Sequence, residues 1–358
     1  MTQSNCVESF LSIVRVGIGK ASPELTLNAD WQAIKALADK QGLTAVIIDG
    51  IGKLPDTKRP PKELLLQWIG EVFQNYENRY KSYQRSIAEL AGWYDSHGYK
   101  IMVLKGYACS LSWPSPSHRP CGDIDIWLFG KQKESDTSLV KEKGVKIDTS
   151  HHHHTVFYWG DFMVENHYDF VNVHHHRSNV ELEKVFKELG SNDKYWTEVN
   201  GERVYLPSPD LHSLFLIKHL ASHFASEEVT LRQLLDWAFF VQRNGKDVNW
   251  NWLVALLKEY NMIEFFNCIN AICVEELGFD SNIFPYVQFN PRLRERVLKE
   301  IISPEFSVQR PNSFFMRIPF RYRRWKANEW KHQLCYKDSM WSAFWSGVWN
   351  HLLKPSSI

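Results

Sequence analysis

The chain has 358 residues and a formal net charge of +1, with 44% hydrophobic and 23% charged residues. This balance is typical of a globular protein with two or three cores, and it excludes a global field that attracts nucleic acid or acidic lipid. The six cysteines include no C-x-x-C pair, which argues against a zinc knuckle or a disulfide framework. We expect a cytoplasmic location, because no basic-then-apolar signal pattern and no run of 18 apolar residues occurs.

Residues 1–98 are predicted to form a helical region. Asn28 or Asp30 is placed to cap a helix with apolar residues at helical spacing. Pro60-Pro61 then begins a long helix, and Gly98 suits a stop just past its end. No pattern in this region points to chemistry, so we interpret it as a helical cap on the next domain.

A short apolar strand over residues 101–104 ends at a Lys-Gly turn. Gly106 permits close approach of the backbone to a ligand at this turn. Residues 107–113 are predicted to form a helix whose first amide groups face the same place, which makes an anion site. Lys105 is either a ligand contact or a solvated strand end.

Acidic and apolar residues alternate in a second strand, Asp123-Ile124-Asp125-Ile126. Side chains alternate between the faces of a strand, so Asp123 and Asp125 point the same way, about 6–7 Å apart. Like charges at this separation repel one another, and a cation between them removes the repulsion. Carboxylates and phosphate oxygens are the ligands that Mg²⁺ takes, so the strand predicts a magnesium site.

A third carboxylate is expected, because two metal ions about 3.5–4 Å apart need more ligands than one Asp pair provides. The candidate strand covers residues 162–170. Glu165, His167 and Asp169 share one face of it, while apolar residues share the other. This pattern fits a half-open site and also fits a solvent-facing edge strand.

Histidine clusters at residues 151–154 and 174–176 flank that strand. Consecutive histidines on a strand point alternately up and down, so the four in the first cluster cannot all ligate one ion. We interpret most of them as partly exposed polar positions, with transition-metal binding as the less favoured alternative. His154, which directly precedes an apolar strand, is the one expected to face the site.

From about residue 206 the chain is predicted to be helical again. Ser208 as cap with Pro209 in the first turn is a strong helix start. His219 and His223 have the i, i+4 spacing of a helical metal pair, but no Glu follows His219 as in metalloproteases. A polar face toward a cleft or water is therefore the favoured interpretation.

Residues 310–349 interleave basic and aromatic side chains. Rings beside cations can stack bases and neutralise phosphates, and an aromatic helix at the end of the chain can lie on a membrane surface. We favour a C-terminal helix that packs its aromatic stripe against the body of the protein while its arginines extend outward. This stretch is the only candidate surface for nucleic acid or membrane.

Three elements of the sequence resemble the signature of the polymerase-beta-like nucleotidyltransferase superfamily: Lys105-Gly106, Arg119, and the Gly-Asp-Ile-Asp stretch that begins at Gly122. They are most similar to its bacterial branch of uncharacterised nucleotidyltransferases. In that branch a Leu-Lys-Gly turn precedes an Arg-x-x-Gly-Asp-x-Asp strand. The wider superfamily has Gly-Ser or Gly-Gly at the turn, whereas Gly106 is followed here by Tyr107, which removes a hydroxyl that can touch a phosphate.

The resemblance implies an α+β fold with a small mixed β-sheet nucleotidyltransferase core over residues 99–205. An N-terminal helical region over residues 1–98 and a C-terminal helical domain over residues 206–358 flank it. The implied reaction transfers a nucleoside monophosphate from an NTP, with ATP as the expected donor, to an unidentified acceptor hydroxyl and releases pyrophosphate.

The resemblance also assigns roles to individual residues. Asp123, Asp125 and Glu165 are expected to hold two Mg²⁺ ions, for which Mn²⁺ can substitute, with Asp169 as the fallback third carboxylate. His154, His167 and Asp169 are expected around these ligands. The residues expected to contact the nucleotide are Lys105, Gly106, Tyr107, Arg119, Gly122, Arg232 and Asp236. Arg232 and Asp236, four residues apart on a helix, can alternatively form a surface ion pair.

Two other functions are considered. The Gly-Tyr turn motivates a catalytically weak nucleotide-binding module of regulatory or antitoxin-like type with the same fold. A metal-dependent phosphohydrolase that uses the histidines is disfavoured, because the chain has no His-Asp doublet and no H-x-x-x-H-x-D arrangement.

Overall fold

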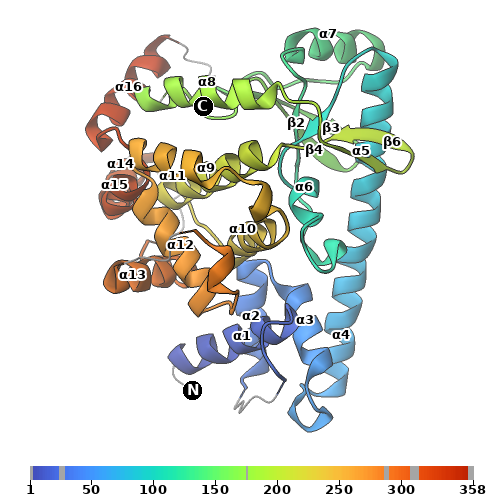
Figure 1. Cartoon of the computed structure of the whole chain (residues 1–358), viewed down its shortest axis with the longest axis vertical. Helices are drawn as coiled ribbons and strands as arrows, with labels where there is room; N and C mark the ends of the chain where they lie inside the picture. Colours follow the sequence, from blue (N-terminus) through green and yellow to red (C-terminus); the bar gives the residue numbers. More distant parts are fainter. Residues whose placement is uncertain (1–2, 24–28, 175, 286–289, 307–313, 354–358) are drawn as a thin grey trace.

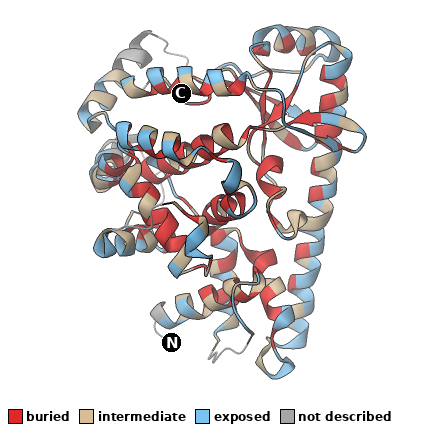
Figure 2. Cartoon of the chain, viewed as in Figure 1, coloured by how far each residue is buried: buried red, intermediate tan, exposed pale blue. Residues whose placement is uncertain are grey.

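The computed structural model describes residues 3–23, 29–174, 176–285, 290–306 and 314–353. A small mixed sheet lies between helices that precede it and helices that follow it in the chain (Figure 1). Buried residues concentrate where these helices face one another and the sheet (Figure 2). The arrangement confirms the predicted α+β fold, in which a sheet core is flanked by N-terminal and C-terminal helical regions.

The first three helices pack together at one end of the molecule (Figure 1). They are α1 (Gln3–Gly17), α2 (Trp31–Gln41) and α3 (Thr44–Lys53). The Asp30 carboxylate caps α2 by accepting a hydrogen bond from the Ala33 backbone N–H, which satisfies an otherwise unpaired donor. Of the two predicted caps, Asp30 is confirmed, and Asn28 lies outside the described residues.

A long helical rod runs along one side of the molecule (Figure 1). It consists of α4 (Lys62–Val72), a π-helical segment (Phe73–Asn78) and α5 (Arg79–Ser96). Trp68 of α4 packs into the core shared with the N-terminal helices, whereas Tyr83 and Ile87 of α5 pack into the core against the sheet. Gly98 follows α5 with a φ of 74°, which confirms the predicted stop.

Six strands form one sheet in the described part of the chain, in the order β3-β4-β2-β1-β6-β5. They are β1 (Met102–Val103), β2 (Ile124–Trp127), β3 (His154–Trp159), β4 (Phe162–His167), β5 (Trp196–Val199) and β6 (Glu202–Tyr205). The pairs β2–β4 and β1–β6 are parallel, and the other neighbours are antiparallel. The mixed sheet therefore places β2, which carries the Asp-Ile-Asp motif, directly beside β4.

The two faces of the sheet have different surroundings. Ile124 and Ile126 face α5 and α7 (Gln132–Lys143) in one core. On the opposite face Trp127 packs on Phe170 with ring centroids 4.4 Å apart, against α8 (Arg177–Gly190) and α9 (Pro209–Ser226). Because side chains alternate along β2, Asp125 lies on this second face.

The helix that follows the Lys-Gly turn is shorter than predicted. Helix α6 covers Tyr107–Ser110 rather than residues 107–113. The chain turns over residues 111–113, ahead of Pro114, and the residue before a proline is disfavoured in a helical conformation. A helix of one turn has few aligned peptide dipoles, so the anion site predicted at its start is weak.

The C-terminal half of the chain is helical, as predicted. Its further helices are α10 (Leu231–Asn244), α11 (Trp250–Glu259), α12 (Ile263–Glu275), α13 (Pro291–Ile302), α14 (Phe314–Ala327), α15 (Glu329–Cys335) and α16 (Met340–Leu353). The Ser208 hydroxyl accepts a hydrogen bond from the Leu211 N–H at the start of α9, which confirms the predicted cap. A capping box formed by Thr230 and Gln233 begins α10.

The aromatic C-terminal stretch is only partly packed against the body. In α15, Lys331 forms a buried ion pair of 2.6 Å with Glu300 of α13. In α16, by contrast, Trp341, Phe344 and Trp345 are exposed, so the prediction that this stripe packs inward is wrong for these three residues. Arg310 and the side chain of Trp349 lie outside the described residues.

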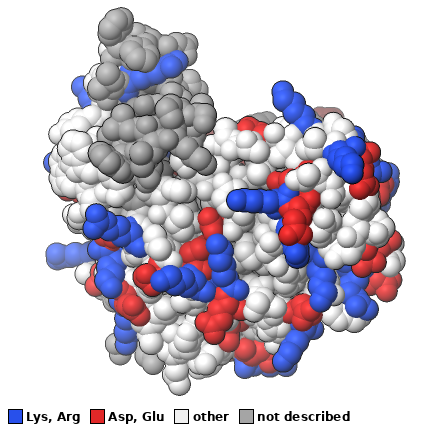
Figure 3. All heavy atoms as spheres, turned by 90° about the horizontal axis from the view of Figure 1, so that it is seen from above, with Lys and Arg blue, Asp and Glu red and all other residues white. Residues whose placement is uncertain are grey.

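The surface shows no long-range charge pattern on the face drawn in Figure 3, where basic and acidic side chains are interspersed. This agrees with the net charge of +1. Among the described residues, no helix combines the length and the apolar character needed to span a membrane.

Candidate active site

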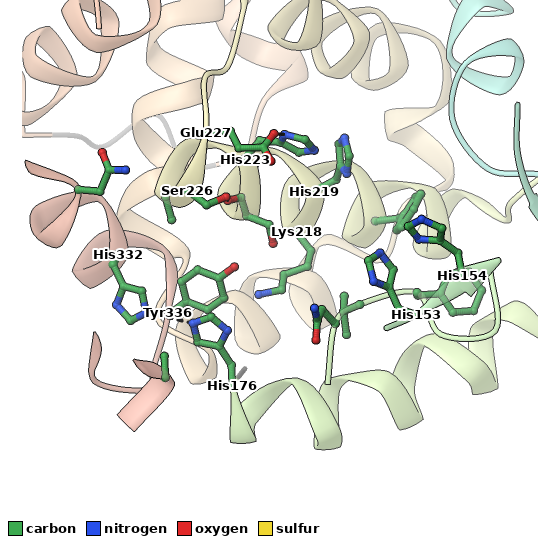
Figure 4. Close-up of a pocket in the computed structure, with 18 of the residues that line it drawn as sticks. His153, His154, His176, Lys218, His219, His223, Ser226, Glu227, His332 and Tyr336 are labelled. Carbon is green, nitrogen blue, oxygen red and sulfur yellow. Dashed lines mark hydrogen bonds and ion pairs between the residues drawn. The ribbon is translucent and has the colours of Figure 1, made fainter. Parts of the chain in front are cut away.

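A cavity of about 810 Å³ lies between the sheet, the start of α8, helix α9 and helices α14 to α16 (Figure 4). The residues at its sheet end are Lys105, Asp123, His153, His154, Glu165 and His167. They come from the ends of β1 and β2, from β4, and from the start of β3. The end of β1 lies beside the start of β2, and the start of β3 lies beside the end of β4, because both pairs are antiparallel neighbours.

Strand register brings the acidic residues together. Asp125 of β2 is the Cα partner of Glu165 on β4, and neighbouring strands lie about 4.8 Å apart. Side chains at partnered positions project from the same face of a sheet, so the two carboxylates lie side by side. Asp123, two residues earlier, projects from that same face and lines the cavity. The three predicted metal-binding carboxylates are therefore adjacent.

Asp125 is the most deeply buried member of this cluster, with 1% of its surface exposed. Lys105 Nζ donates to Asp125 Oδ1 at 2.7 Å, and His167 Nε2 lies 3.1 Å from the same oxygen. Burial alone raises the pKa of Asp125, but the Lys105 charge and the His167 hydrogen bond outweigh it and hold that pKa below its ordinary value. Asp125 is consequently an ionised, fixed carboxylate.

The pKa of Asp123 is shifted in the opposite direction from that of Asp125. Burial, followed by the negative charges of Asp125 and Glu165, raises the pKa of Asp123 despite the nearby Lys105. Its backbone carbonyl accepts a hydrogen bond of 2.7 Å from the Tyr83 hydroxyl, which fixes the chain at the start of β2. The surroundings of Asp123 therefore disfavour its charged form, and an added cation would favour it.

Glu165 contacts two histidines. Its Oε2 lies 3.5 Å from His167 Nε2 and its Oε1 lies 3.9 Å from His154 Nε2. Burial opposes the charge of Glu165, but the His167 contact lowers the pKa of this carboxyl overall. Burial likewise opposes the charge of His167, yet the hydrogen bonds that its ring donates to Asp125 and Glu165 raise the pKa of His167 to about 9. His167 is therefore protonated at neutral pH and acts as a second cation beside Lys105.

The cluster is suited to hold a cation. Ligand atoms of Asp125, Glu165 and His167 all lie within 4.8 Å of one another. Three carboxylates and two protein cations leave a net charge of about −1, so the arrangement has capacity for added positive charge. Carboxylate oxygens are the ligands preferred by Mg²⁺ and Mn²⁺.

A tyrosine side chain packs against the glycine turn and leaves no room for a side chain at Gly106. Gly106 has a φ of 48°, and a Cβ at this position would lie 2.3 Å from the Tyr83 hydroxyl oxygen. Tyr107 is buried at 3% exposure. The described residues that line the cavity include neither of these two, nor Gly122. Their assignment to nucleotide contact stays a prediction.

Arg119 and Asp236 form a buried ion pair away from the cavity lining. Arg119 donates through Nε to Asp236 Oδ1 at 2.8 Å and through Nη2 to Oδ2 at 3.0 Å. The Trp113 indole donates to Oδ1 as well, at 2.8 Å. The alternative of a surface ion pair between Arg232 and Asp236 is wrong, because Asp236 is 3% exposed and bonded to Arg119. Arg232 packs beside Gly42.

Asp169, the fallback third carboxylate, lies outside the cluster. Strand β4 ends at His167 rather than continuing to residue 170, so the predicted alternation of faces does not extend to Asp169. Its carboxylate forms an ion pair of 2.5 Å with Lys187 of α8. Glu165 therefore provides the third carboxylate in the structure.

Comparison with known proteins identifies the family of the chain. Residues 28–278 match the family described as uncharacterised nucleotidyltransferases. The chain belongs to this nucleotidyltransferase family. A search of curated proteins finds no match.

One solved structure is similar, that of an antigenic nucleotidyltransferase-like protein from Paracoccidioides brasiliensis. It shares 15% sequence identity, with a TM-score of 0.34, over 49% of this chain and 87% of that chain.

Family membership confirms the resemblance drawn from the Lys-Gly turn and the Asp-Ile-Asp strand. The matched residues include β1 to β6 and extend through α12 (Figure 1). In this member of the nucleotidyltransferase family, the cluster of Asp123, Asp125 and Glu165 is the candidate active site.

The helical wall of the cavity was largely missed from the sequence. His219 and His223 line it, in agreement with a polar face toward a cleft. Lys218 was not predicted to line a cavity. In the structure it is 3% exposed, and its Nζ lies 4.1 Å from the centroid of the Tyr336 ring. A lysine inside the apolar run over residues 211–221 was the available signal, because buried lysines need a partner or a cavity.

Proposed function

We propose that this family member is a metal-dependent nucleotidyltransferase that transfers a nucleoside monophosphate from an NTP, with ATP as the expected donor, to an acceptor hydroxyl. The observation that carries the proposal is the pairing of Asp125 with Glu165 across β2 and β4. With Asp123, it gathers three carboxylates, of which Asp123 and Glu165 line one end of a cavity of about 810 Å³. A cluster of this kind suits phosphoryl chemistry assisted by two metal ions.

The donor set fits two Mg²⁺ ions, for which Mn²⁺ can substitute. Asp123, Asp125 and Glu165 supply hard oxygen ligands, and the raised pKa of Asp123 reflects negative charge that a cation relieves. When bound, such ions polarise the phosphoryl oxygens and offset the charge of the leaving pyrophosphate.

The protein side chains orient the carboxylates and offset negative charge in the cavity. Lys105 and His167 hold Asp125 in one orientation, because both bond the same carboxylate oxygen. Lys105 also brings positive charge to the cavity wall, beside the pyrophosphate that leaves. Glu165 is ionised at neutral pH and accepts the proton of the acceptor hydroxyl. The new bond joins the acceptor oxygen to the α-phosphorus, and the bond between that phosphorus and the bridging oxygen of pyrophosphate breaks.

Incubation of the full chain with each α-labelled NTP, Mg²⁺ or Mn²⁺ and a cell extract tests this proposal. The expected result is label on an acceptor with the wild type and none with Asp123→Asn. Asp169→Asn is the matched control, since it removes a nearby carboxylate that does not line the cavity. Equal labelling by the wild type and Asp123→Asn refutes the catalytic assignment.

A second candidate function, a nucleotide-binding module with little turnover, is favoured by the turn itself. Tyr107 is buried and stacks on Tyr80 with ring centroids 6.2 Å apart, so this turn offers no side-chain hydroxyl to a phosphate. Calorimetry with a non-hydrolysable ATP analogue and Mg²⁺, beside a pyrophosphate assay with ATP, separates the two functions. Binding without pyrophosphate release in any extract supports the module.

A further inference from the structure

Imidazole rings form the cavity wall next to the carboxylates. His153, His154 and His167 each offer a ring nitrogen, and these nitrogens lie within 4.8 Å of one another. The ring centroids of His153 and His154 are 4.4 Å apart, and those of His154 and His167 are 5.3 Å apart. Figure 4 shows His153 and His154 side by side at one end of the cavity. Three ring nitrogens thus converge on one small volume.

The sequence predicted that the four consecutive histidines cannot all ligate one ion, and two of the four converge here. Alternation of faces applies only within a strand, and β3 begins only at His154. His153 lies in the bend that precedes the strand, where side chains do not alternate. His167 is the Cα partner of His154 on β4 and projects from the same face. Neighbouring histidines can therefore serve one site.

Unsatisfied ring nitrogens provide independent support. Nδ1 of His153 and Nδ1 of His154 are buried and have no hydrogen-bond partner among the described residues. His154 is 7% exposed, so bulk water does not compensate for the missing partner. Buried polar atoms are nearly always paired, and an ion or an ordered water commonly accounts for an exception.

We propose that His153, His154 and His167 bind a transition-metal ion, of which Zn²⁺ is the expected example. Imidazole nitrogens suit Zn²⁺, Co²⁺ and Ni²⁺, whereas Mg²⁺ takes oxygen ligands. The proposal rests on this geometry and does not depend on nucleotidyl transfer.

A metal on His167 takes the place of a ring proton, which is released, and of one of the contacts that the ring now makes. These are Nε2 with Asp125 at 3.1 Å and Nδ1 with the Asp169 carbonyl oxygen at 3.3 Å. Loss of the second leaves Asp125 bonded to the far ring nitrogen, the arrangement by which carboxylates orient metal-ligating histidines. Asp125 keeps its bond to Lys105 in either case.

Titration of the metal-free full chain with Co²⁺, followed by visible absorption, tests the site. The expected result is saturation at about one ion per chain, displacement by Zn²⁺, and retention in excess Mg²⁺. His153→Ala and His154→Ala are each expected to weaken Co²⁺ binding at least about tenfold. Absence of Co²⁺ binding by the wild type overturns the proposal.

His151→Ala is the matched control. His151 belongs to the same histidine run, and its ring stacks on His154 with centroids 4.7 Å apart, but it is not one of the three converging residues. Its substitution is expected to leave Co²⁺ affinity unchanged. An equal loss of affinity with His151→Ala and His153→Ala shows undirected binding by a histidine-rich segment and refutes the site.

X-ray absorption of the Zn²⁺-loaded wild type removes any dependence on the folding of variants. We expect imidazole nitrogens about 2.0–2.1 Å from the metal. A first shell made only of oxygen places the ion on the carboxylates instead and overturns the proposal.

Discussion

Two buried ion pairs in this protein have similar geometry but different surroundings. Lys105 with Asp125 and Arg119 with Asp236 both join a cation to a carboxylate at 2.7–2.8 Å, and both carboxylates are at most 3% exposed. The first pair is surrounded by more titratable groups, Asp123 and Glu165 among them, and lies at the end of a cavity. The second is completed by an indole N–H and lies outside the cavity lining.

The difference teaches that pairing alone does not mark a site. Arg119 bonds Asp236 through two nitrogens, and this pair links the segment before β2 to α10, so we interpret it as a connection between the sheet core and the C-terminal helices. In the Lys105 pair, one carboxylate oxygen takes both bonds, and two further acids, Asp123 and Glu165, share the same two cations. Several acidic side chains beside a cavity distinguish a candidate functional site from an ion pair that only connects two parts of the fold.

The largest expected effect is at Glu165, which lies beside the first pair. Glu165→Gln removes a negative charge from the cluster and the proposed proton acceptor, so we expect nucleotidyl transfer to fall about a thousandfold. The measurement is single-turnover transfer of labelled NMP, with Asp169→Asn as control. Thermal unfolding should be nearly unchanged. Undiminished transfer by Glu165→Gln removes this residue from the mechanism.

At the second pair the expected loss is in stability. Asp236→Asn leaves the Arg119 charge buried without its partner, so we expect the free energy of unfolding to fall by about 3–5 kcal/mol. Urea denaturation measures it, and the double variant Arg119→Met with Asp236→Leu should recover part of the loss. If Asp236→Asn instead keeps its stability and loses NTP affinity in calorimetry, the sequence prediction of nucleotide contact is right. The interpretation of this pair as a connection between the sheet core and the C-terminal helices is then wrong.

A smaller effect is expected at the turn that precedes the first pair. Gly106→Ala forces a Cβ to within 2.3 Å of the Tyr83 hydroxyl, at a φ of 48°. We expect a loss of about 1–3 kcal/mol in the free energy of unfolding. Tyr83→Phe removes the clashing oxygen, so a double-mutant cycle should show a favourable interaction between the two substitutions. Strict additivity would show that the backbone conformation, not the hydroxyl, requires glycine.

The smallest effect comes from a lysine in the cavity wall without such a pair. Lys218 forms no ion pair with a carboxylate among the described residues, and burial lowers its pKa from the ordinary 10.5 to about 8. The folded state therefore binds this proton more weakly than the unfolded state, and charge on Lys218 costs stability below about pH 8. Lys218→Met should raise the free energy of unfolding at pH 7 by about 1 kcal/mol, a modest value because the amine faces the cavity.

The sign of the pH dependence distinguishes this explanation from improved packing. As the pH rises from about 8 to 10.5, the lysine loses its proton in both states, so the advantage of Lys218→Met should fade. Chemical denaturation at several pH values measures it. An advantage that stays constant with pH points to packing alone.

Local pattern in the sequence determined most of the secondary structure and the central motif of the site. Apolar spacing and capping residues predicted the helices, since Asp30 and Ser208 satisfy backbone donors within their own segment. Alternation along β2 gave the common face of Asp123 and Asp125, because that periodicity is a property of a single strand.

Tertiary structure alone decided which of the other candidates join them. Strand register put Glu165 beside Asp125, and the end of β4 at His167 left Asp169 to pair with Lys187. A bend before β3 turned His153 toward His154, and helix packing drew Asp236 to Arg119 rather than to Arg232. Such contacts join residues far apart in the chain or depend on where an element ends, and neither is encoded in the periodicity of one segment.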